Sequence, residues 1–507
     1  MSKKTGYRGI KLDLKYIILI AIIITILLFY LYPIIQEDNN STNSATVYNS
    51  TENYTDDEDY KQYFISDGKE NSNEYITEIL VKKDIGKPTG ITIDDNNNIW
   101  FSNNHKGYII EYNTEINKFT EYKIPLDEYE QNYTQIWSIV SNNNSIWFTE
   151  AENNLILKFN TKTSEFSKYE IPTPDSFPLQ LAIDDNQNIW FTETYGKKIG
   201  KISKLTNGEY SNKIIEIDIP GEIDLLGGLD IDNDNNIWFN FLSINGNITN
   251  SKIGQFNQIN EEITIFDVPR NIIAPVGIAI DSENMIWIAD HGSNFIAKFN
   301  PKNNKFNIYS TSIPDNYPTS LPYWIEVEGE NVISNEHWGN KILQYNKNDG
   351  SLIEYNILTE NPKWNNLANV LKISQIKNGE IWFTEMTENK IAKLDTKIDI
   401  PFTIRVDNSQ IKVNQDTETE IELIIEFNEL TSGEIYFRKS LIYSLDRIET
   451  EIEITTNDYK EINDIKKHTQ IIQIKVNNVE KDVYNVMLGI EVNNVTKLIP
   501  VTIIVQE

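Results

Sequence analysis

The sequence predicts an all-β protein whose main domain is a seven-bladed β-propeller. Three observations predict this fold: a motif that recurs at nearly constant spacing, four strand-like runs in every copy, and one further strand-like run ahead of the first copy. The motif reads Ile-Trp-Phe-Thr-Glu in its best copies, and isoleucine replaces its tryptophan once. These anchors are Trp100, Trp147, Trp190, Trp238, Trp287, Ile333 and Trp382. Their intervals of 47, 43, 48, 49, 46 and 49 residues are typical of one four-stranded propeller blade per copy.

The four runs of each copy follow one order along the chain. An apolar run such as 277–281 comes first, the tryptophan motif second, a run such as 198–202 third, and a Phe-x-x-Tyr-x-Ile-Pro run such as 166–172 fourth. Turns rich in Asp and Asn, for example 94–98, separate the first two runs, as a tight hairpin requires. We expect each large tryptophan ring to fill the wedge between two twisted blades.

The fourth run indicates how the ring closes. It occurs only six times inside the array, and no copy follows the last third run at 390–394. Residues 75–80 have the missing pattern and precede the first blade. We therefore expect an N-terminal strand to complete the last blade of a propeller spanning 74–397, which leaves no open sheet edge.

The N-terminal region predicts a membrane anchor. Residues 1–15 form a basic tail, and 16–35 are uncharged and long enough to cross a bilayer as one helix. The basic flank predicts a cytoplasmic N-terminus, a single-pass protein in the cell membrane, and an extracellular remainder. A cleaved signal peptide is the alternative, although no small-x-small site follows the long apolar run. Residues 36–73 lack a sustained period and predict a disordered acidic stalk.

The C-terminal region, 398–507, predicts an immunoglobulin-like β-sandwich. The period of the array stops there, and about seven short alternating runs follow without helical periodicity. The region has neither the cysteine pair nor the tryptophan of antibody domains, so the likeness is architectural. The predicted strands are 402–406, 420–427, 434–437, 448–455, 470–476 and two more up to 505.

Composition excludes several functions. The chain of 507 residues has no cysteine, which excludes disulfides, thiolate metal sites and cysteine nucleophiles. Its formal net charge of -30 argues against a nucleic-acid partner and favours solubility and cation binding.

The residue three positions after each anchor is the most informative one for function. Because it ends the second strand of its blade, ring symmetry predicts that its copies meet around one mouth of the central channel. Five carboxylates there suit Mg²⁺ or Ca²⁺, although protonation, basic partners or local pairing with lysines would also relieve their repulsion. The copies are Asn103, Glu150, Glu193, Phe241, Asp290, Glu336 and Glu385.

The loops that follow these acids predict a ligand-binding rim. Three of the four histidines of the chain fall in these loops, and aromatic residues share the same positions or start the inner strand of the sixth blade. The alternative is that they are ordinary polar residues of exposed loops. The predicted rim comprises His105, His291, His337, Tyr195, Tyr323, Trp324 and Trp338, with His337 and His291 as candidate catalytic residues.

The motifs resemble those of the streptogramin B lyase (virginiamycin B lyase) family. The best copies are 168–174 and 189–202, which combine Lys-Tyr-Glu-Ile-Pro-Thr-Pro with Ile-Trp-Phe-Thr-Glu and Lys-Lys-Ile-Gly-Lys. The resemblance implies a seven-bladed propeller that opens a cyclic depsipeptide antibiotic by elimination, with Mg²⁺, a pair of carboxylates and a histidine base. In that family the base lies in a Pro-His-Gly-Ile segment that begins the inner strand of a late blade, with a Glu just before its Pro.

This chain departs from the family pattern at the base. No histidine occupies the corresponding positions, and the segment Ala274-Pro275-Val276-Gly277 also lacks the preceding Glu. His291 or His337 replaces the base only if the loops carry it inward, whereas Glu385 and its counterparts keep the carboxylate. The positions without histidine are Thr89, Ile136, Leu179, Gly227, Val276, Tyr323 and Leu371.

Three functional hypotheses follow from the sequence. The first is a membrane-anchored, extracellular propeller that binds an unidentified ligand or envelope partner at an acid-rich channel mouth, with a divalent cation as an optional cofactor. The second is a Mg²⁺-dependent carbon–oxygen lyase similar to the family. The third is a structural protein of the cell envelope.

Overall fold

The computed structural model describes residues 60–64, 71–81, 87–104, 106–127, 134–245, 248–359 and 362–506. The predicted basic tail, the predicted membrane anchor at 16–35, most of the predicted stalk, and His105 lie outside these residues. Within them, no helix is long and apolar enough to cross a membrane. Residues Ser50–Ile244 and Thr249–Glu507 belong to one compact unit, which contains both the repeat array and the C-terminal strands.

The repeat array forms antiparallel blades of four strands, as predicted. Six blades are separate sheets, and β24–β27 form a set of the same size and order at the start of a larger sheet. The first blade is β4 (Lys87–Ile93), β5 (Ile99–Asn104), β6 (Tyr108–Asn113) and β7 (Lys118–Lys123). The second is β8 (Ile139–Asn142), β9 (Ser145–Glu150), β10 (Leu155–Asn160) and β11 (Glu165–Glu170). The third is β12 (Pro178–Ile183), β13 (Ile189–Glu193), β14 (Lys198–Lys204) and β15 (Tyr210–Asp218). The fourth and fifth are β16 (Leu225–Ile231), β17 (Ile237–Asn245), β18 (Ile248–Asn257) and β19 (Glu262–Asp267); and β20 (Pro275–Ile280), β21 (Ile286–Asp290), β22 (Phe295–Asn300) and β23 (Lys305–Ser310).

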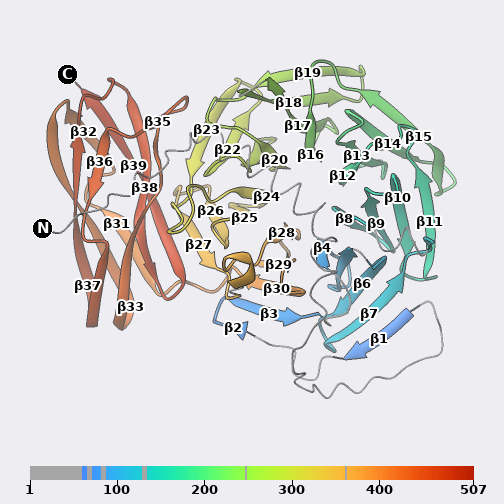
Figure 1. The fold of residues 1–507 in the computed structure, drawn as a ribbon, viewed down its shortest axis with the longest axis horizontal. Coiled ribbons are helices and arrows are strands. Elements are labelled where there is room, and N and C mark those ends of the chain that lie inside the picture. The colour runs from blue at the N-terminus through green and yellow to red at the C-terminus, as the bar shows by residue number, and fades with distance from the viewer. Residues whose placement is uncertain are drawn as a thin grey trace, which may run out of the picture. The chain divides into compact units, whose positions relative to one another are not determined.

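The sixth and seventh blades contain the last two anchors, Ile333 and Trp382. The sixth is β24 (Pro322–Glu328), β25 (Asn331–Glu336), β26 (Lys341–Asn346) and β27 (Leu352–Asn356). The seventh is β28 (Val370–Ile373), β29 (Glu380–Glu385), β30 (Lys390–Asp395) and β3 (Ile76–Leu80), preceded by the 3-10 helix η2 (Pro362–Trp364). Each first strand contacts the first strand of the next set, and β28 contacts β4, which closes a ring with the first strands innermost (Figure 1).

The N-terminal strand closes the ring as predicted. Strand β3 pairs antiparallel with β30, with Ile76 opposite Leu394 and Leu80 opposite Lys390 (Figure 1). Two further strands, β1 (Tyr60–Phe64) and β2 (Asn71–Ser72), fall within the segment predicted to be a disordered stalk. The prediction of disorder is wrong for these residues, because β1 pairs with the outer strand β7 and β2 pairs with β3.

Each tryptophan anchor packs against aromatic rings of the following blade, which confirms its predicted role as a wedge. The ring centroids of Trp100 and Phe159 lie 5.6 Å apart, and those of Trp147 and Tyr210 lie 4.6 Å apart. The last anchor, Trp382, returns to the first blade and lies 5.8 Å from Tyr112. Such pairs add favourable aromatic contacts to the burial of apolar surface.

Four of the anchors have a second role, in ordering a turn, that their spacing did not predict. In the turn between the first two strands, Asp184 accepts hydrogen bonds from the main chain and side chain of Asn188 and from the Trp190 indole at 2.9 Å. An aspartate six residues before the tryptophan therefore orders the hairpin turn and satisfies the buried indole. The same Asp–Trp hydrogen bond occurs at Asp94–Trp100, Asp232–Trp238 and Asp281–Trp287.

The C-terminal region is all β, as predicted, with alternate residues buried in one apolar cluster in the manner of a sandwich. Two predicted strands, 420–427 and 434–437, are one long strand with register shifts between Glu426 and Gly433. The strands are β31 (Phe402–Val406), β32 (Gln410–Asn414), β33 (Thr417–Lys439), β34 (Ile442–Tyr443), β35 (Ile448–Glu449), β36 (Ile452–Thr455), β37 (Tyr459–Val476), β38 (Val483–Val492) and β39 (Val495–Gln506).

The two regions are joined by main-chain pairing. The outer strand β27 of the sixth blade pairs antiparallel with β39, with Leu352 opposite Leu498 and Tyr355 opposite Val495. The C-terminal strands thereby cover the edge that this blade would otherwise expose.

Candidate functional site

The carboxylates at the second-strand ends do not share a site. All five are buried, with exposed fractions of 0 or 1%. Glu150 accepts hydrogen bonds from the main-chain N–H groups of Gln135 and Asn153, both at 2.7 Å and both within its own blade. Asp290 is held in the same way by N–H groups of Ile273, Ala274 and Gly292 and by the Ser293 hydroxyl. These two side chains are therefore satisfied locally.

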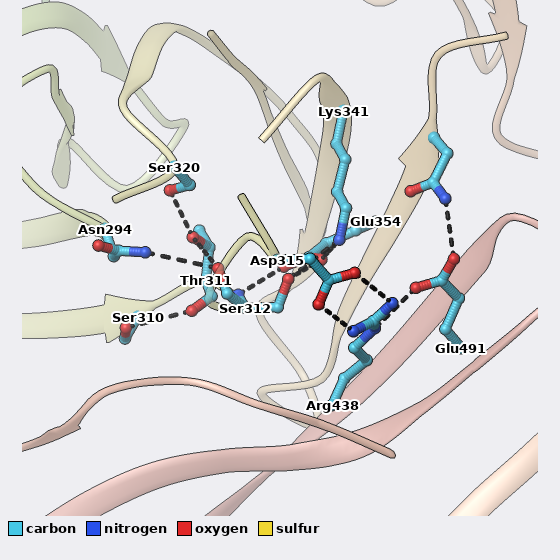
Figure 2. A network of polar contacts seen from close by, with 11 residues as sticks. Asn294, Ser310, Thr311, Ser312, Asp315, Ser320, Lys341, Glu354, Arg438 and Glu491 are labelled. Atoms are coloured by element: carbon cyan, nitrogen blue, oxygen red, sulfur yellow. Dashed lines mark hydrogen bonds and ion pairs between the residues drawn. The ribbon is translucent and has the colours of Figure 1, made fainter. Parts of the chain in front are cut away.

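The other three carboxylates stand beside a lysine of the third strand and a glutamate of the fourth strand. In the sixth blade, Glu336 lies beside Lys341, whose Nζ is 2.6 Å from Glu354 (Figure 2). Lys341 also donates to the Ser312 hydroxyl at 3.0 Å, and the Ser312 N–H donates to Glu354 at 2.7 Å. Because Ser312 belongs to the connection from the fifth blade, the group links two blades.

The same arrangement recurs in the third and seventh blades. Lysine Nζ lies 3.0 Å from the glutamate in both, and it donates to a threonine hydroxyl that comes from the preceding blade connection. In the seventh blade the glutamate is supplied by the closing strand β3, so this group fastens the ring. The two sets are Glu193, Lys198, Glu216 and Thr173, and Glu385, Lys390, Glu78 and Thr359. We call the three groups the Glu–Lys–Glu staples.

The staples keep their second-strand carboxylates protonated. Burial, together with the Glu216 carboxylate, raises the pKa of Glu193 to about 8. Burial likewise raises the pKa of Glu336 and Glu385, with added repulsion from Glu354 and Glu78 respectively. A neutral carboxylic acid binds cations poorly.

The predicted cation ring therefore gains no support. Glu150 and Asp290 are held by local hydrogen bonds, whereas both carboxyl oxygens of Glu193, Glu336 and Glu385 are buried and accept no hydrogen bond from the described residues. Each of these three lies opposite the lysine of the third strand of its own blade. Among the residues that the structure describes, no three His, Cys, Asp or Glu side chains are grouped closely enough to hold a metal ion. Mg²⁺ or Ca²⁺ does not fit these positions as a shared ligand set.

The candidate catalytic histidines do come together. His291 Nε2 lies 2.9 Å from His337 Nδ1, and the Tyr323 ring stacks on His337 with centroids 4.5 Å apart. Both histidines are buried, with 5% and 6% exposure. Burial lowers the pKa of His291 to about 4, and burial and His291 lower the pKa of His337, so both are neutral at pH 7.

The other predicted rim residues separate. Tyr195 is exposed and packs on Phe177, whose ring in turn contacts Trp137. Trp338 stacks on Tyr317 in a different loop cluster. Trp324 is buried with Tyr323 in β24 but lines the central channel.

The channel holds a cavity of about 290 Å³ that is lined by the inner strands of all seven blades. Most lining residues lie in the second half of these strands, whereas the second-strand acids pair with their first residues, as Pro322 does with Glu336. The cavity is thus distinct from the predicted acid rim. Its polar and aromatic lining comes mainly from Trp137, Gln180, Asp230, Trp324, Glu326, Lys372 and Gln375.

Lys372 spans this channel from the seventh blade. Its Nζ lies 2.7 Å from the centroid of the Trp324 ring and donates to Gln180 Oε1 of the third blade at 3.4 Å. The residue is only 3% exposed, and burial lowers the pKa of its amine well below the usual value while Glu326 opposes this shift. A lysine held over an aromatic face and beside a carboxyl group is a specific polar contact point.

Two carboxyl groups face the same cavity. Burial and the nearby Asp230 raise the pKa of Glu326 to about 8, and burial raises the pKa of Asp230 to about 6. Trp324 Nε1 donates to Glu326 at 3.3 Å, and the Ile280 N–H donates to Asp230 at 2.8 Å. The channel therefore contains acids and an amine whose pKa values are displaced toward neutrality, which is common at functional sites.

Asp230, Glu326 and Lys372 were not predicted from the sequence. For Asp230 and Glu326, the pairing pattern of the first hairpin contains a clue. The residue opposite the anchor across the first hairpin is apolar in several blades, as for Ala182 opposite Trp190 and Ala279 opposite Trp287. Asp230 and Glu326 hold that position opposite Trp238 and Ile333. An acidic residue at this usually apolar position of an inner strand therefore predicts a residue that lines the channel.

Residues 74–370 match the sequence profile of the Virginiamycin B lyase family. The chain belongs to this family. Virginiamycin B lyase from Staphylococcus aureus is 26% identical, with 63% of this chain covering 98% of that one at a TM-score of 0.53. A catalytically inactive histidine-to-alanine variant from the same organism with quinupristin is 25% identical over 63% and 98%, also at a TM-score of 0.53. A streptogramin B lyase structure is 26% identical over 63% and 97%, with a TM-score of 0.53. No curated protein sequence matches the chain.

Tyr323 is one of the seven inner-strand positions without a histidine, and it lies in β24 at the start of the sixth blade. Tyr323 is buried and its ring contacts both His291 and His337, which follow β21 and β25. Burial raises the pKa of this phenol, so it stays protonated at neutral pH.

Proposed function

We propose that this member of the virginiamycin B lyase family is a membrane-anchored propeller that binds a ring-sized part of a ligand in its central channel and does not catalyse elimination. The observation that carries the proposal is the channel cavity with Lys372, Glu326 and Asp230 on its walls. Asp230 and Glu326 occur at positions that the third and fifth blades fill with alanine.

The chemistry of the cavity favours binding of a ligand that is partly aromatic and partly polar. Burial of charged side chains costs free energy unless hydrogen-bonding partners compensate for it. A bound ligand that hydrogen-bonds Lys372 and Glu326 would offset this cost, and Trp324 and Trp137 offer apolar surface for a ring. The cavity volume suits one ring-sized group rather than a whole cyclic peptide.

The absence of a histidine at the family position argues against elimination. That reaction needs a base to take the α-proton of the depsipeptide, while the C–H electrons form a C=C bond and the ester oxygen leaves as a carboxylate. None of the seven corresponding inner-strand positions holds a histidine, and Tyr323, which is one of them, is buried and protonated and so is a poor base.

Quinupristin, the compound bound to the family relative, is the probe for this proposal. We expect it to quench tryptophan fluorescence saturably and to be recovered with the chromatographic retention and fragment masses of the intact ring, since the ring-opened isomer has the same total mass. Glu326→Gln and Lys372→Met should each weaken binding about tenfold, as expected for loss of a buried charged hydrogen bond. Lys298→Met is the matched control, because Lys298 lies over Trp287 at 5.5 Å outside the channel. Binding that is indifferent to both channel variants would contradict the proposal.

The alternative is a carbon–oxygen lyase that uses the neutral histidine pair. It is favoured by the contact between His291 and His337 next to Tyr323, one of the inner-strand positions that correspond to the family's base. In that case quinupristin would be recovered as the ring-opened product, with a mass equal to that of the substrate because elimination only rearranges it. Loss of ring opening in His337→Ala, with folding retained by circular dichroism, would establish this function instead.

The membrane anchor is supported by residues 16–35 and their basic flank. We expect the full-length chain to remain with membranes after alkaline carbonate extraction. Deletion of residues 1–35 should release the protein to the soluble fraction. Release of the full-length chain by carbonate would contradict an integral anchor.

A further inference from the structure

A second cavity, of about 350 Å³, lies between the sixth blade and the C-terminal strands. Its propeller wall comes from the connection 313–317, the loop 338–341 and the connection 365–367. Its other wall comes from Arg438, Glu491 and Asn494 of β33, β38 and the following turn. The C-terminal strands lie beyond the part of the chain that matches the lyase family, so this cavity is separate from the channel.

The charged groups of this cavity neutralise one another. Arg438 binds Asp315 through both terminal nitrogens, at 2.7 and 3.1 Å, and its Nε donates to Glu491 at 2.7 Å (Figure 2). Lys341 is paired with Glu354 behind the wall. Such satisfied fork-shaped pairs leave little free charge for an ionic ligand.

One wall carries an aromatic platform. Tyr317 and Trp338 stack with ring centroids 5.3 Å apart and an angle of 28° between their planes. The Tyr317 hydroxyl donates to the Asn365 carbonyl at 3.3 Å, which fixes the ring from the adjacent connection. Both rings are partly exposed, so their edges and outer faces remain open to a ligand.

The rest of the lining is rich in carboxamides. Asn356 donates through Nδ2 to Glu491 at 2.9 Å, while its buried Oδ1 accepts no hydrogen bond from the described residues. A buried acceptor without a donor costs free energy, and a ligand hydroxyl would satisfy it. Asn316, Asn365 and Asn366 are exposed on the opposite side.

We propose that this cavity binds a neutral saccharide. The apolar faces of a sugar ring pack on aromatic rings, and its hydroxyls both donate to and accept from carboxamides. An acidic ligand would have to compete with Asp315 and Glu491 for Arg438, and an aliphatic ligand would leave the Asn356 carbonyl unsatisfied. The sandwich is thereby part of a binding site and not only a spacer.

The test is a glycan array that carries neutral and acidic saccharides, probed with the full-length chain in a detergent without a sugar headgroup. We expect one or more neutral saccharides to bind, with a dissociation constant then measured by calorimetry. Trp338→Ala should weaken binding about tenfold, the upper range for loss of one aromatic contact. Asn356→Asp should also weaken it, because it places a second carboxylate beside Glu491.

Two controls make the result decisive. Ile471→Ala removes an exposed apolar side chain of β37, a strand that does not line this cavity, and should leave saccharide affinity unchanged. Trp338→Phe keeps an aromatic face and should restore most of the affinity that Trp338→Ala loses. The proposal is overturned if no saccharide binds, if only acidic saccharides bind, or if binding is unaffected by Trp338→Ala. Quinupristin binding in the channel should not respond to Trp338→Ala, so the two sites are tested separately.

Discussion

The Glu–Lys–Glu staples and the channel cluster contain similar residues in very different settings. Each staple repeats the same contacts in three blades, with every lysine paired to a glutamate and to a hydroxyl. The channel cluster occurs once, draws Asp230, Glu326 and Lys372 from three different blades, and adjoins a cavity. Repetition indicates a structural role that every blade can need, whereas a single occurrence on the common axis indicates a role in binding.

The largest expected effect tests the structural half of this comparison. Lys390→Met removes the partner of Glu78, which is fully buried in the ring-closing strand. We expect a loss of about 3–5 kcal/mol, because a buried carboxylate is left without its cation. Urea unfolding followed by tryptophan fluorescence reports on the propeller, since all tryptophans precede residue 398.

The third blade supplies the matched control for that variant. The Lys198 side chain is 24% exposed, against 6% for Lys390. We therefore expect Lys198→Met to cost only about 1 kcal/mol, because solvent screens this pair. Equal losses in the two variants would contradict a special role of the seventh staple in closing the ring.

Replacing the channel lysine Lys372 should raise the free energy of unfolding, whereas replacing a staple lysine should lower it. Lys372 is buried and its amine pKa is lowered, so folding at pH 7 requires this group to lose its proton or to stay charged in an apolar setting. Lys372→Met should therefore raise the free energy of unfolding by about 2 kcal/mol, within the gain seen when buried charges are replaced by apolar groups. The same variant should weaken quinupristin binding, which is the cost expected at a functional site. A loss of stability would place Lys372 with the structural staples.

The staples also predict a pH dependence. Glu193 has a folded pKa raised from 4.5 to about 8, so between these values the folded chain holds a proton that the unfolded chain has released. Its contribution to stability is complete below pH 4.5 and is lost as the pH rises toward 8. Glu193→Gln should remove this dependence and be more stable than the parent by about 4 kcal/mol at pH 8, with little difference at pH 5, because one pKa unit corresponds to about 1.4 kcal/mol. The exposed Glu170→Gln is the control, and a parallel pH profile for both variants would contradict the assignment.

The blades could be predicted from sequence because their anchors obey a simple rule of spacing. The wedge position needs a large flat ring in every blade, so the tryptophans recur, and the missing fourth run at the end pointed directly to residues 75–80. The site could not be predicted in the same way. Glu193 and Glu385 were placed on the channel by ring symmetry, but symmetry fixes only which residues are equivalent and not whether they face the axis. Both side chains are instead buried next to Lys198 and Lys390, which pair with Glu216 and Glu78 of the outer strands, and the spacing of the anchors does not predict these contacts.

Two tryptophan anchors differ in whether their indole N–H has an acceptor, and this difference gives the smallest expected change in stability. Trp190 donates its indole hydrogen bond to Asp184, whereas Trp147 has Ser141 six residues earlier and its buried Nε1 meets no acceptor in the described part of the chain. Both rings are fully buried wedges, so replacement by phenylalanine removes similar packing. Trp190→Phe also leaves Asp184 with one donor fewer, while Trp147→Phe removes an unsatisfied donor. We therefore expect Trp147→Phe to cost about 1 kcal/mol less than Trp190→Phe in urea unfolding. Equal costs would mean that the anchors act through packing alone and that the Asp–Trp hydrogen bond only orders the turn.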